Sequence, residues 1–360
     1  ERERERERES ERLSIHPLST YQLAHLPSPP PPKRAVLALI PALGAIAAGN
    51  TVVLKPCVVS PASAKLMAEL LPKYVDSSIL SIIGADMDGD RACTGALLKE
   101  KFDLIFFTGS TTVGKVVARG AAEHLTPCIL ELGGKNPVYV HKDADIGNAA
   151  RRIVWGRMLN GGQQVGASAL SSLGSRLCSL VAALSSLTSS LNAMNLMQCV
   201  APDYVLCHED VIEEFEEKCA FYIKSSFGDD AAARKASVDF GRLVGAKQHK
   251  RVSSLLDVHG GAIVCGGECD ADTKYIAPTV VRVPFDSPMM EAETFGPVLL
   301  TLSVKTLNEA VEYISEQPKP LAQYIFAKSD AAVATILQST SAGGVTVNGT
   351  IFHAGHPGSL

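Results

Sequence analysis

The sequence lacks the features that would assign the chain to several specialised classes. No window holds eighteen or more clean apolar residues, so a membrane-spanning helix is not expected. The first residues alternate glutamate and arginine instead of forming an apolar segment, which argues against a secretory signal. The net charge of −4 indicates no basic surface for nucleic acid. A globular protein of 360 residues remains, 46% of them hydrophobic and 20% charged, which is long enough for two domains.

The sequence also lacks a disulfide pattern and a complete metal site. Its nine cysteines are odd in number and scattered, which favours reduced thiols in an intracellular compartment. We therefore expect a cytoplasmic protein. Cys265 and Cys269 lie near His259, but no second cysteine or histidine pair completes a zinc site, so no metal is expected.

The chain begins with a leader of biased composition. Residues 1–12 are rich in alternating Glu and Arg, and residues 26–32 read LPSPPPP, which is typical of a polyproline spacer. We predict a disordered, charged and proline-rich leader over residues 1–33. A non-enzymatic interaction protein that uses this leader is one alternative function.

The folded part of the chain has an α/β pattern. Continuous apolar runs, which indicate buried strands, alternate with amphipathic segments and predict a parallel sheet with crossover helices. The expected strands of the first domain cover residues 51–54, 79–83 and 102–107, and its expected helices cover residues 35–48, 61–71, 90–100 and 112–123. We assign residues 34–163 to this domain and expect its N-terminal part to be incomplete.

The pattern is interrupted once and then resumes. Residues 164–197 are a blend of Ser, Leu and Ala without a sustained helical stripe, and we predict an unpatterned insert there. Residues 198–350 return to alternating strands and helices and form the second α/β domain, followed by a tail at residues 351–360.

Three candidate binding residues lie at the ends of strands in the first domain. Lys55 ends one apolar strand, and Gly109 and Ser110 end another at the start of the sequence GSTTVG, which closes at Gly114. Binding sites in parallel sheets lie at the carboxyl ends of the strands. Glycines in such a turn let the backbone approach a pyrophosphate, whose charge meets the N-terminus of the next helix. A plain strand-to-helix turn and a solvated loop lysine are the structural alternatives.

Two further residues have the chemistry of a catalytic site. Glu131 ends an apolar strand, and burial would raise its pKa toward the range of a general base. Its alternative is a structural carboxylate bonded to backbone amides. Cys199 is followed by a short polar turn and a strand, so it is a candidate thiolate nucleophile. Its alternative is a buried, inert cysteine.

Five motifs occur in a fixed order along the chain. They are IAAGNTVVLKP (46–56), FTGSTTVG (107–114), ELGGK (131–135), CVAPDY (199–204) and ETFGP (293–297). Together they resemble the NAD(P)-dependent aldehyde dehydrogenases, and within them the class 3, fatty-aldehyde type. The resemblance covers residues 35 to about 350, apart from the insert.

The resemblance implies a fold and a reaction. The fold is a Rossmann-like cofactor domain followed by an α/β catalytic domain. Cys199 is the nucleophile that adds to an aldehyde, and a thiohemiacetal and then a thioester form on it. Glu131 activates the water that hydrolyses the thioester to a carboxylic acid. The implied substrate is a medium- or long-chain aliphatic or an aromatic aldehyde.

The resemblance also implies cofactor-binding residues. Lys55 and Glu293 bind the adenosine and nicotinamide riboses respectively, and Phe295 packs near the nicotinamide. Ser110 contacts the pyrophosphate, within the turn bounded by Gly109 and Gly114.

The implied cofactor is NAD or NADP. The family often has a glutamate three residues after the ribose-binding lysine, and this chain has Val58 there. Without that carboxylate a 2′-phosphate is not repelled, so NADP is expected beside NAD.

The chain departs from the family at three further places. The insert separates Gln163 from Gln198 and Cys199, and we hypothesise a retained intron or a mis-predicted gene model. The N-terminal part of the family, with the Asn of the oxyanion hole, is absent. The segment after Asn348 lacks the arm through which the family forms homodimers, so a dimer is not expected here, and it lacks the membrane anchor of some class 3 enzymes.

We therefore predict an aldehyde dehydrogenase acting on a small-molecule aldehyde, with no nucleic-acid partner. A catalytically impaired homologue that only binds nucleotide is the first alternative. A thiol esterase that uses Cys199 without nicotinamide is another.

Overall fold

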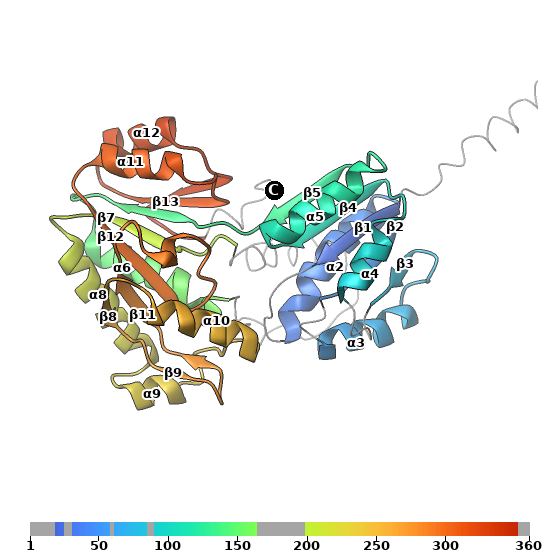
Figure 1. Cartoon of the computed structure of the whole chain (residues 1–360), viewed down its shortest axis with the longest axis horizontal. Helices are drawn as coiled ribbons and strands as arrows, with labels where there is room; N and C mark the ends of the chain where they lie inside the picture. Colours follow the sequence, from blue (N-terminus) through green and yellow to red (C-terminus); the bar gives the residue numbers. More distant parts are fainter. Residues whose placement is uncertain (1–18, 25–30, 58–60, 85–89, 164–198, 352–360) are drawn as a thin grey trace, which may run out of the picture. The chain divides into compact units, whose positions relative to one another are not determined.

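The computed structural model describes residues 19–24, 31–57, 61–84, 90–163 and 199–351 (Figure 1). The chain divides into two compact units, and the division in the folded part falls between Glu131 and Leu132. We call the N-terminal part unit 1 and the C-terminal part unit 2, and describe each by itself.

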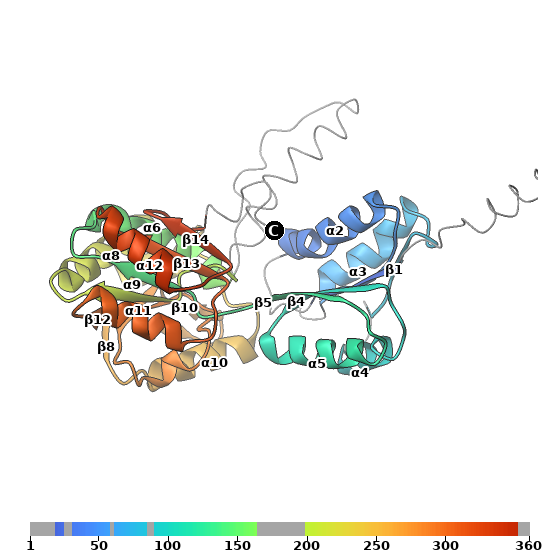
Figure 2. The ribbon, with the colours of Figure 1, turned by 90° about the horizontal axis from the view of Figure 1, so that it is seen from above.

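Unit 1 is built on a five-stranded sheet with the order β3-β2-β1-β4-β5. The strands are β1 (Ser19–Ala24), β2 (Thr51–Lys55), β3 (Leu80–Ile82), β4 (Leu104–Gly109) and β5 (Cys128–Leu132). Strands β3, β2, β1 and β4 pair in parallel. The helices are α2 (Pro31–Ala47), α3 (Pro61–Leu70), α4 (Asp90–Leu97) and α5 (Thr111–Ala122), with a short 3-10 turn η1 (Leu71–Lys73) after α3. Figure 2 shows α2 and α3 on one face of the sheet and α4 and α5 on the other.

The prediction of a disordered leader over residues 1–33 is wrong for part of that range. Strand β1 pairs in parallel with both β2 and β4, so it lies in the middle of the sheet. Its sequence STYQLA contains the β-formers Thr20 and Tyr21, which suit a strand. Helix α2 begins at Pro31, because proline is tolerated in the first turn of a helix. The remainder of the leader, residues 1–18 and 25–30, lies outside the described residues.

Unit 2 is built on a seven-stranded sheet with the order β14-β13-β6-β7-β12-β11-β8. The strands are β6 (Pro137–Val140), β7 (Tyr204–His208), β8 (Ala262–Cys265), β11 (Thr279–Arg282), β12 (Val298–Val304), β13 (Ala322–Phe326) and β14 (Gly344–Val347). Neighbours pair in parallel except β8, which is antiparallel to β11. A small antiparallel pair, β9 (Cys269–Asp270) and β10 (Tyr275–Ile276), stands apart.

The helices of unit 2 cover both faces of this sheet. They are α6 (Ile146–Met158), α8 (Ile212–Phe227), α9 (Ala231–Ala236), α10 (Ala246–Asp257), α11 (Leu307–Glu316) and α12 (Asp330–Ser339), with 3-10 turns η2 (Leu159–Gly162) and η4 (Pro288–Met290). Alternate residues of β7 show the arrangement. Val205 and Cys207 pack with α6 and α8, whereas Tyr204 and Leu206 pack with α10, α11 and α12. All five residues of β7 are buried, so the continuous apolar runs of the sequence reflect strands covered on two faces.

These two units confirm the predicted α/β fold class with two α/β parts. The predicted boundary at residue 163 is wrong, because β6 and α6 belong to unit 2. Strand β6 pairs between β13 and β7, which follow it far along the chain. Alternation of strands and helices continues unbroken across the boundary, so it does not reveal where one sheet ends and the next begins. The predicted insert at residues 164–197 lies outside the described residues.

Candidate functional site

The segment from Cys199 to Asp203 leads directly into the amino end of β7. Cys199 is partly exposed, and the next four residues are buried. The Asn136 side chain, placed just before β6, donates from Nδ2 to the carbonyls of Cys199 (2.7 Å) and Ala201 (3.1 Å). The Tyr324 hydroxyl donates to the carbonyl of the intervening Val200. The cysteine segment is therefore fixed from two neighbouring strands of the sheet.

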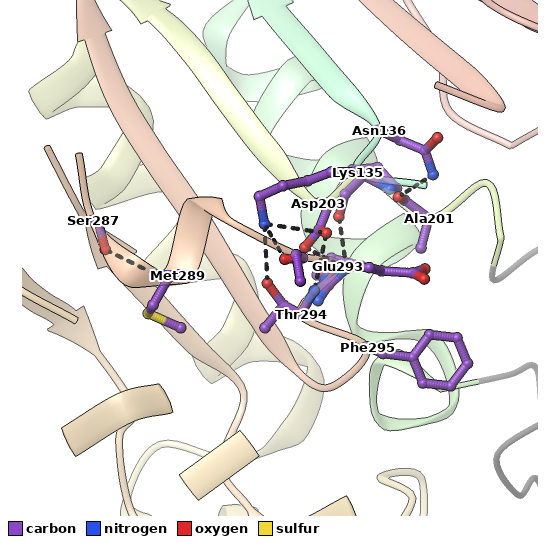
Figure 3. Close-up of polar contacts among 12 residues, drawn as sticks. Lys135, Asn136, Ala201, Asp203, Ser287, Met289, Glu293, Thr294 and Phe295 are labelled. Carbon is purple, nitrogen blue, oxygen red and sulfur yellow. Dashed lines mark hydrogen bonds and ion pairs between the residues drawn. The ribbon is translucent and has the colours of Figure 1, made fainter. Parts of the chain in front are cut away.

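A buried group of charges lies at the base of this segment (Figure 3). The Asp203 carboxylate is 3.3 Å from Lys135 Nζ and 3.2 Å from Arg157 Nη1, and it accepts a hydrogen bond of 3.1 Å from the backbone N–H of Thr294. Arg157 Nη1 also donates to the carbonyl of Pro202, at 3.2 Å. Burial alone would raise the pKa of Asp203, but Lys135 and Arg157 hold it below its ordinary value. This charge cluster connects β6, β7, α6 and the ETFGP segment.

Glu293 lies beside the first glycine of the ELGGK motif. A Cβ atom on Gly133 would come within 2.4 Å of Glu293 Oε2, so only glycine leaves room for this carboxyl. Burial, with the negative charge of Asp203, raises the pKa of the Glu293 carboxyl to about 8. A carboxyl that is easily protonated at neutral pH thus lies against the Gly-Gly turn.

Phe295 has an unusual backbone conformation. Its φ of 43° is in the left-handed region that non-glycine residues rarely adopt. Gln248 Nε2 donates to its carbonyl at 2.8 Å, and Arg251 donates to the carbonyls of Thr294 and Phe295. These contacts from α10 hold the ETFGP segment in place.

The sequence NGGQ at residues 160–163 packs against the same segment. Gly162 has φ of 66°, and a Cβ there would lie 2.1 Å from the carbonyl oxygen of Gly296. The buried Gln163 amide donates to the carbonyl of Arg242 (2.9 Å) and accepts from the N–H of Val244 (2.9 Å). The close approach of Gly296 explains glycine at position 162, and these hydrogen bonds explain glutamine at position 163. Neither explanation requires a ligand.

The candidate residues of unit 1 lie at strand ends, as predicted. Lys55 is the last residue of β2 and is buried, so the alternative of a solvated loop lysine is wrong. Gly109 is the last residue of β4, and Ser110 caps α5 by accepting a hydrogen bond from the Val113 N–H (3.4 Å). Gly114 is buried in the first turns of α5. The N-terminus of a helix of twelve residues thus directly follows the glycine turn, which suits an anionic group.

Glu131 lies in β5, near the division between the units. Burial raises the pKa of its carboxyl, as expected. Among the described residues, no hydrogen bond reaches this carboxylate, which disfavours the alternative of a structural carboxylate bonded to backbone amides.

The structure brings the LGGK part of the ELGGK motif together with the CVAPDY and ETFGP motifs within unit 2, at the amino ends of β6, β7 and β12. Sequence reasoning predicted Cys199, Glu293 and Phe295 there. It did not single out Asn136, Arg157 or Tyr324. Asn136 and Tyr324 had no signal beyond their nearness to apolar strands, and Arg157 is one of several arginines in α6.

Two further findings concern the described part of the chain. No helix there is long and apolar enough to cross a membrane. In those same ranges, no group of three His, Cys, Asp or Glu side chains converges as a metal site.

Fold and site together define a two-unit α/β protein with a fixed cysteine segment beside a buried charge cluster. Comparison with known proteins identifies the family. The sequence pattern of the Aldehyde dehydrogenase family matches residues 35–173 and 177–358, and the chain belongs to this family. It is similar to the dimeric NADP-preferring aldehyde dehydrogenase of Mus musculus, with 41% identity over 88% of this chain and 61% of that protein.

Two other relatives agree with this assignment. Aldehyde dehydrogenase family 3 member A2 of Rattus norvegicus is 39% identical over 88% of this chain and 57% of that protein. The substrate-bound Staphylococcus aureus AldH structure is 33% identical, with a TM-score of 0.79, over 95% of this chain and 65% of that chain. The resemblance to the class 3 branch is confirmed. The chain spans about three-fifths of the length of the curated relatives described here.

Proposed function

We propose that this chain oxidises an aldehyde to a carboxylic acid with NAD or NADP. The observation that carries the proposal is the fixing of the Cys199–Asp203 segment by Lys135 and Asn136, at the end of the ELGGK motif and directly after it. The nucleophile adds to a carbonyl carbon, and that carbon must then lie next to a hydride acceptor. The nucleophile therefore requires a fixed position. Membership of the aldehyde dehydrogenase family supports the same reaction.

The roles that we propose for the chain's own residues are those that the resemblance to the family implies. The Cys199 thiolate adds to the aldehyde carbon, and the carbonyl oxygen takes the negative charge of a thiohemiacetal. Loss of hydride from that carbon re-forms the carbonyl and leaves a thioester on Sγ. The Glu131 carboxylate, whose pKa is raised by burial, takes a proton from water, and the hydroxide adds to the thioester. Expulsion of the thiolate gives the carboxylic acid.

The residues present fit a nicotinamide dinucleotide. The Gly109-Ser110 turn before α5 offers backbone N–H groups to a pyrophosphate. Lys55 at the end of β2 and Glu293 beside Gly133 supply hydrogen-bonding groups for ribose hydroxyls. When bound, the cofactor accepts the hydride. The name of the mouse relative, NADP-preferring, supports NADP beside NAD.

A pocket in unit 2, lined by apolar side chains and also by Arg151, Arg152 and Asp239, is a candidate site for the hydrocarbon part of an aldehyde. It has a volume of about 460 Å³ and lies between α6 and α8. Trp155, Met158, Leu159, Tyr222 and Phe227 form its apolar wall. We propose a medium- or long-chain aliphatic or an aromatic aldehyde as substrate, with its hydrocarbon part in this pocket. The KM for aldehydes of increasing chain length should fall, and Trp155→Ala should flatten that trend.

Turnover of the purified chain tests the function. Absorbance at the nicotinamide wavelength should rise with aldehyde and either cofactor, and Cys199→Ser should abolish the rise. Isothermal titration with the same cofactors separates the alternatives. Binding without turnover would identify an impaired homologue, and ester hydrolysis that needs no nicotinamide would identify a thiol esterase.

We also propose a cytoplasmic location, because the nine cysteines of the sequence are odd in number and scattered, which favours reduced thiols. Cell fractionation tests this location. The mouse relative is named dimeric, and light scattering of the purified chain will determine whether this chain also forms dimers.

A further inference from the structure

Four consecutive backbone carbonyl groups, starting at the candidate nucleophile Cys199, are held by side chains. The carbonyls of Cys199, Val200, Ala201 and Pro202 each accept a hydrogen bond from a side chain of another element. The donors are Asn136, Tyr324 and Arg157, all of them at most 2% exposed. Buried polar side chains are costly unless their hydrogen bonds are satisfied, so this arrangement depends on the segment lying where it does.

Asn136 has the most complete role in this set. Its Nδ2 donates to two of the carbonyls, and its Oδ1 accepts from the backbone N–H of Ala322 at 2.9 Å. Turning the amide over would place Oδ1 against two carbonyl oxygens and Nδ2 against an N–H group, so only one orientation satisfies the contacts. The carbonyl of Asn136 also accepts from the N–H of Asp203, at 3.0 Å. One residue therefore holds the segment by main chain and side chain together.

We propose that Asn136 is a positioning residue for Cys199. Its amide fixes the carbonyl of Cys199 and therefore the rotation of the peptide plane that follows the cysteine Cα. That rotation, together with the hold on Ala201, limits the direction in which Cβ and Sγ leave the backbone. Tyr324 restricts the backbone further, because it holds the carbonyl of Val200 between Cys199 and Ala201. The inference rests on the proposed function, because it concerns the same reaction.

The effect expected of Asn136 is on orientation, not on the thiol itself. Hydride loss requires the thiohemiacetal carbon to lie at a defined place, and a displacement of about 1 Å can cost about 10²-fold in rate. Alkylation of a thiol by a small reagent such as iodoacetamide has no comparable demand. Turnover and alkylation at the same sulfur atom therefore distinguish two roles of Asn136. Loss of positioning lowers turnover alone, whereas a general loss of structure changes both rates.

The test compares three variants of the full chain. Asn136→Ala removes both side-chain donors, and Tyr324→Phe removes one hydroxyl with little change of shape. Gln323→Ala is the matched control, because this buried amide neighbours Tyr324 in β13 and bonds Thr340 rather than the cysteine segment. Each variant is assayed for kcat, for the KM of the cofactor and for the rate of Cys199 alkylation.

We expect Asn136→Ala to lower kcat about 10²-fold and Tyr324→Phe about 10-fold, with alkylation and cofactor KM within about threefold of the wild type. Gln323→Ala should leave kcat unchanged. A kcat within about threefold of the wild type in Asn136→Ala would overturn the inference, as would equal losses of kcat and alkylation. If Asn136→Ala does not fold, Tyr324→Phe decides by the same comparison.

Failure of the proposed function gives a different result. In that case the wild type itself produces no reduced nicotinamide. Acylation of Cys199 by p-nitrophenyl acetate, which needs no cofactor, then takes the place of kcat. A slowing of about 10²-fold in Asn136→Ala, with normal alkylation, would support the positioning role, and an unchanged acylation rate would refute it.

Discussion

Replacing Asp203 with asparagine should destabilise unit 2 strongly. The carboxylate is fully buried, and it faces both Lys135 and Arg157. Asparagine keeps the shape and still accepts from the N–H of Thr294, but it leaves two cations without their shared counter-ion. Breaking a buried ion pair by removing one partner typically costs about 3–5 kcal/mol. Lys135 can lose its proton, because burial already lowers its pKa, so we expect the lower end, about 3 kcal/mol.

The single tryptophan of the chain makes this loss measurable in unit 2 alone. Trp155 lies in α6, so its fluorescence follows the unfolding of unit 2. A loss of about 3 kcal/mol corresponds to a fall in melting temperature of roughly 6–12 °C for a unit of this size. Asp210→Asn is the control, because that carboxylate is 63% exposed and lies 3.4 Å from a single partner side chain, His208. Its loss should be below about 1 kcal/mol.

The pH dependence of this difference distinguishes charge from shape. The pKa of Asp203 is lowered in the folded chain, so its stabilisation is present above the pKa of the unfolded state and disappears as the pH falls through the folded pKa. The gap between wild type and Asp203→Asn should therefore be constant at neutral pH and shrink below about pH 4. A melting temperature equal to that of Asp210→Asn, or a gap that persists in acid, would refute the reasoning.

Three further predictions concern the site. Glu131→Gln should lower steady-state turnover about 10²–10⁴-fold while a first burst of reduced nicotinamide remains in rapid-mixing experiments, and loss of the burst would contradict a role in thioester hydrolysis. Gly133→Ala should raise the KM for cofactor, because its Cβ would lie 2.4 Å from Glu293 Oε2, whereas the control Gly134→Ala meets its nearest atom at 3.5 Å. Glu293 has its pKa raised to about 8, so its contribution to stability should decline as the pH rises from about 4.5 to 8, and melting curves of Glu293→Gln should lack this component.

The sequence predicted the elements better than the way they assemble. Apolar strands and amphipathic helices were recognisable because both faces of each sheet are covered, and the elements expected for residues 51–123 occur close to the predicted positions. Strand β1 was missed because its residues lie between a charged repeat and a proline run. Its place in the sheet depends on β2 and β4, which follow it in the chain. The boundary was missed because β6 finds its partners far along the sequence.

The site shows the same limit at the level of single side chains. Motifs identified Cys199, Glu131 and Lys55, whose roles stay predictions. The contacts that hold Cys199 could not be read from the sequence, because Asn136 and Tyr324 reach it across separations of 63 to 124 residues. A buried asparagine or tyrosine has the same local sequence signal whether it holds a nucleophile or only fills a core.

The site of unit 2 lies at the amino ends of its strands, whereas the rule for parallel sheets places ligands at the carboxyl ends. The residues of unit 1 follow the rule. In unit 2 the cysteine precedes β7, so the sheet holds it through the residues that come after it. On the other side of the predicted insert, Gln163 is held separately by Arg242 and Val244.

The described residues on either side of the predicted insert, Gln163 and Cys199, are thus each held by hydrogen bonds from other parts of unit 2. We therefore expect a chain that retains residues 164–197 to keep Cys199 in place. Deletion of residues 164–197 should change the rate of Cys199 acylation by p-nitrophenyl acetate less than Asn136→Ala does, because loop length enters the closure entropy only logarithmically. A deletion that restored activity to an inactive parent chain would show instead that the segment controls the position of the thiol.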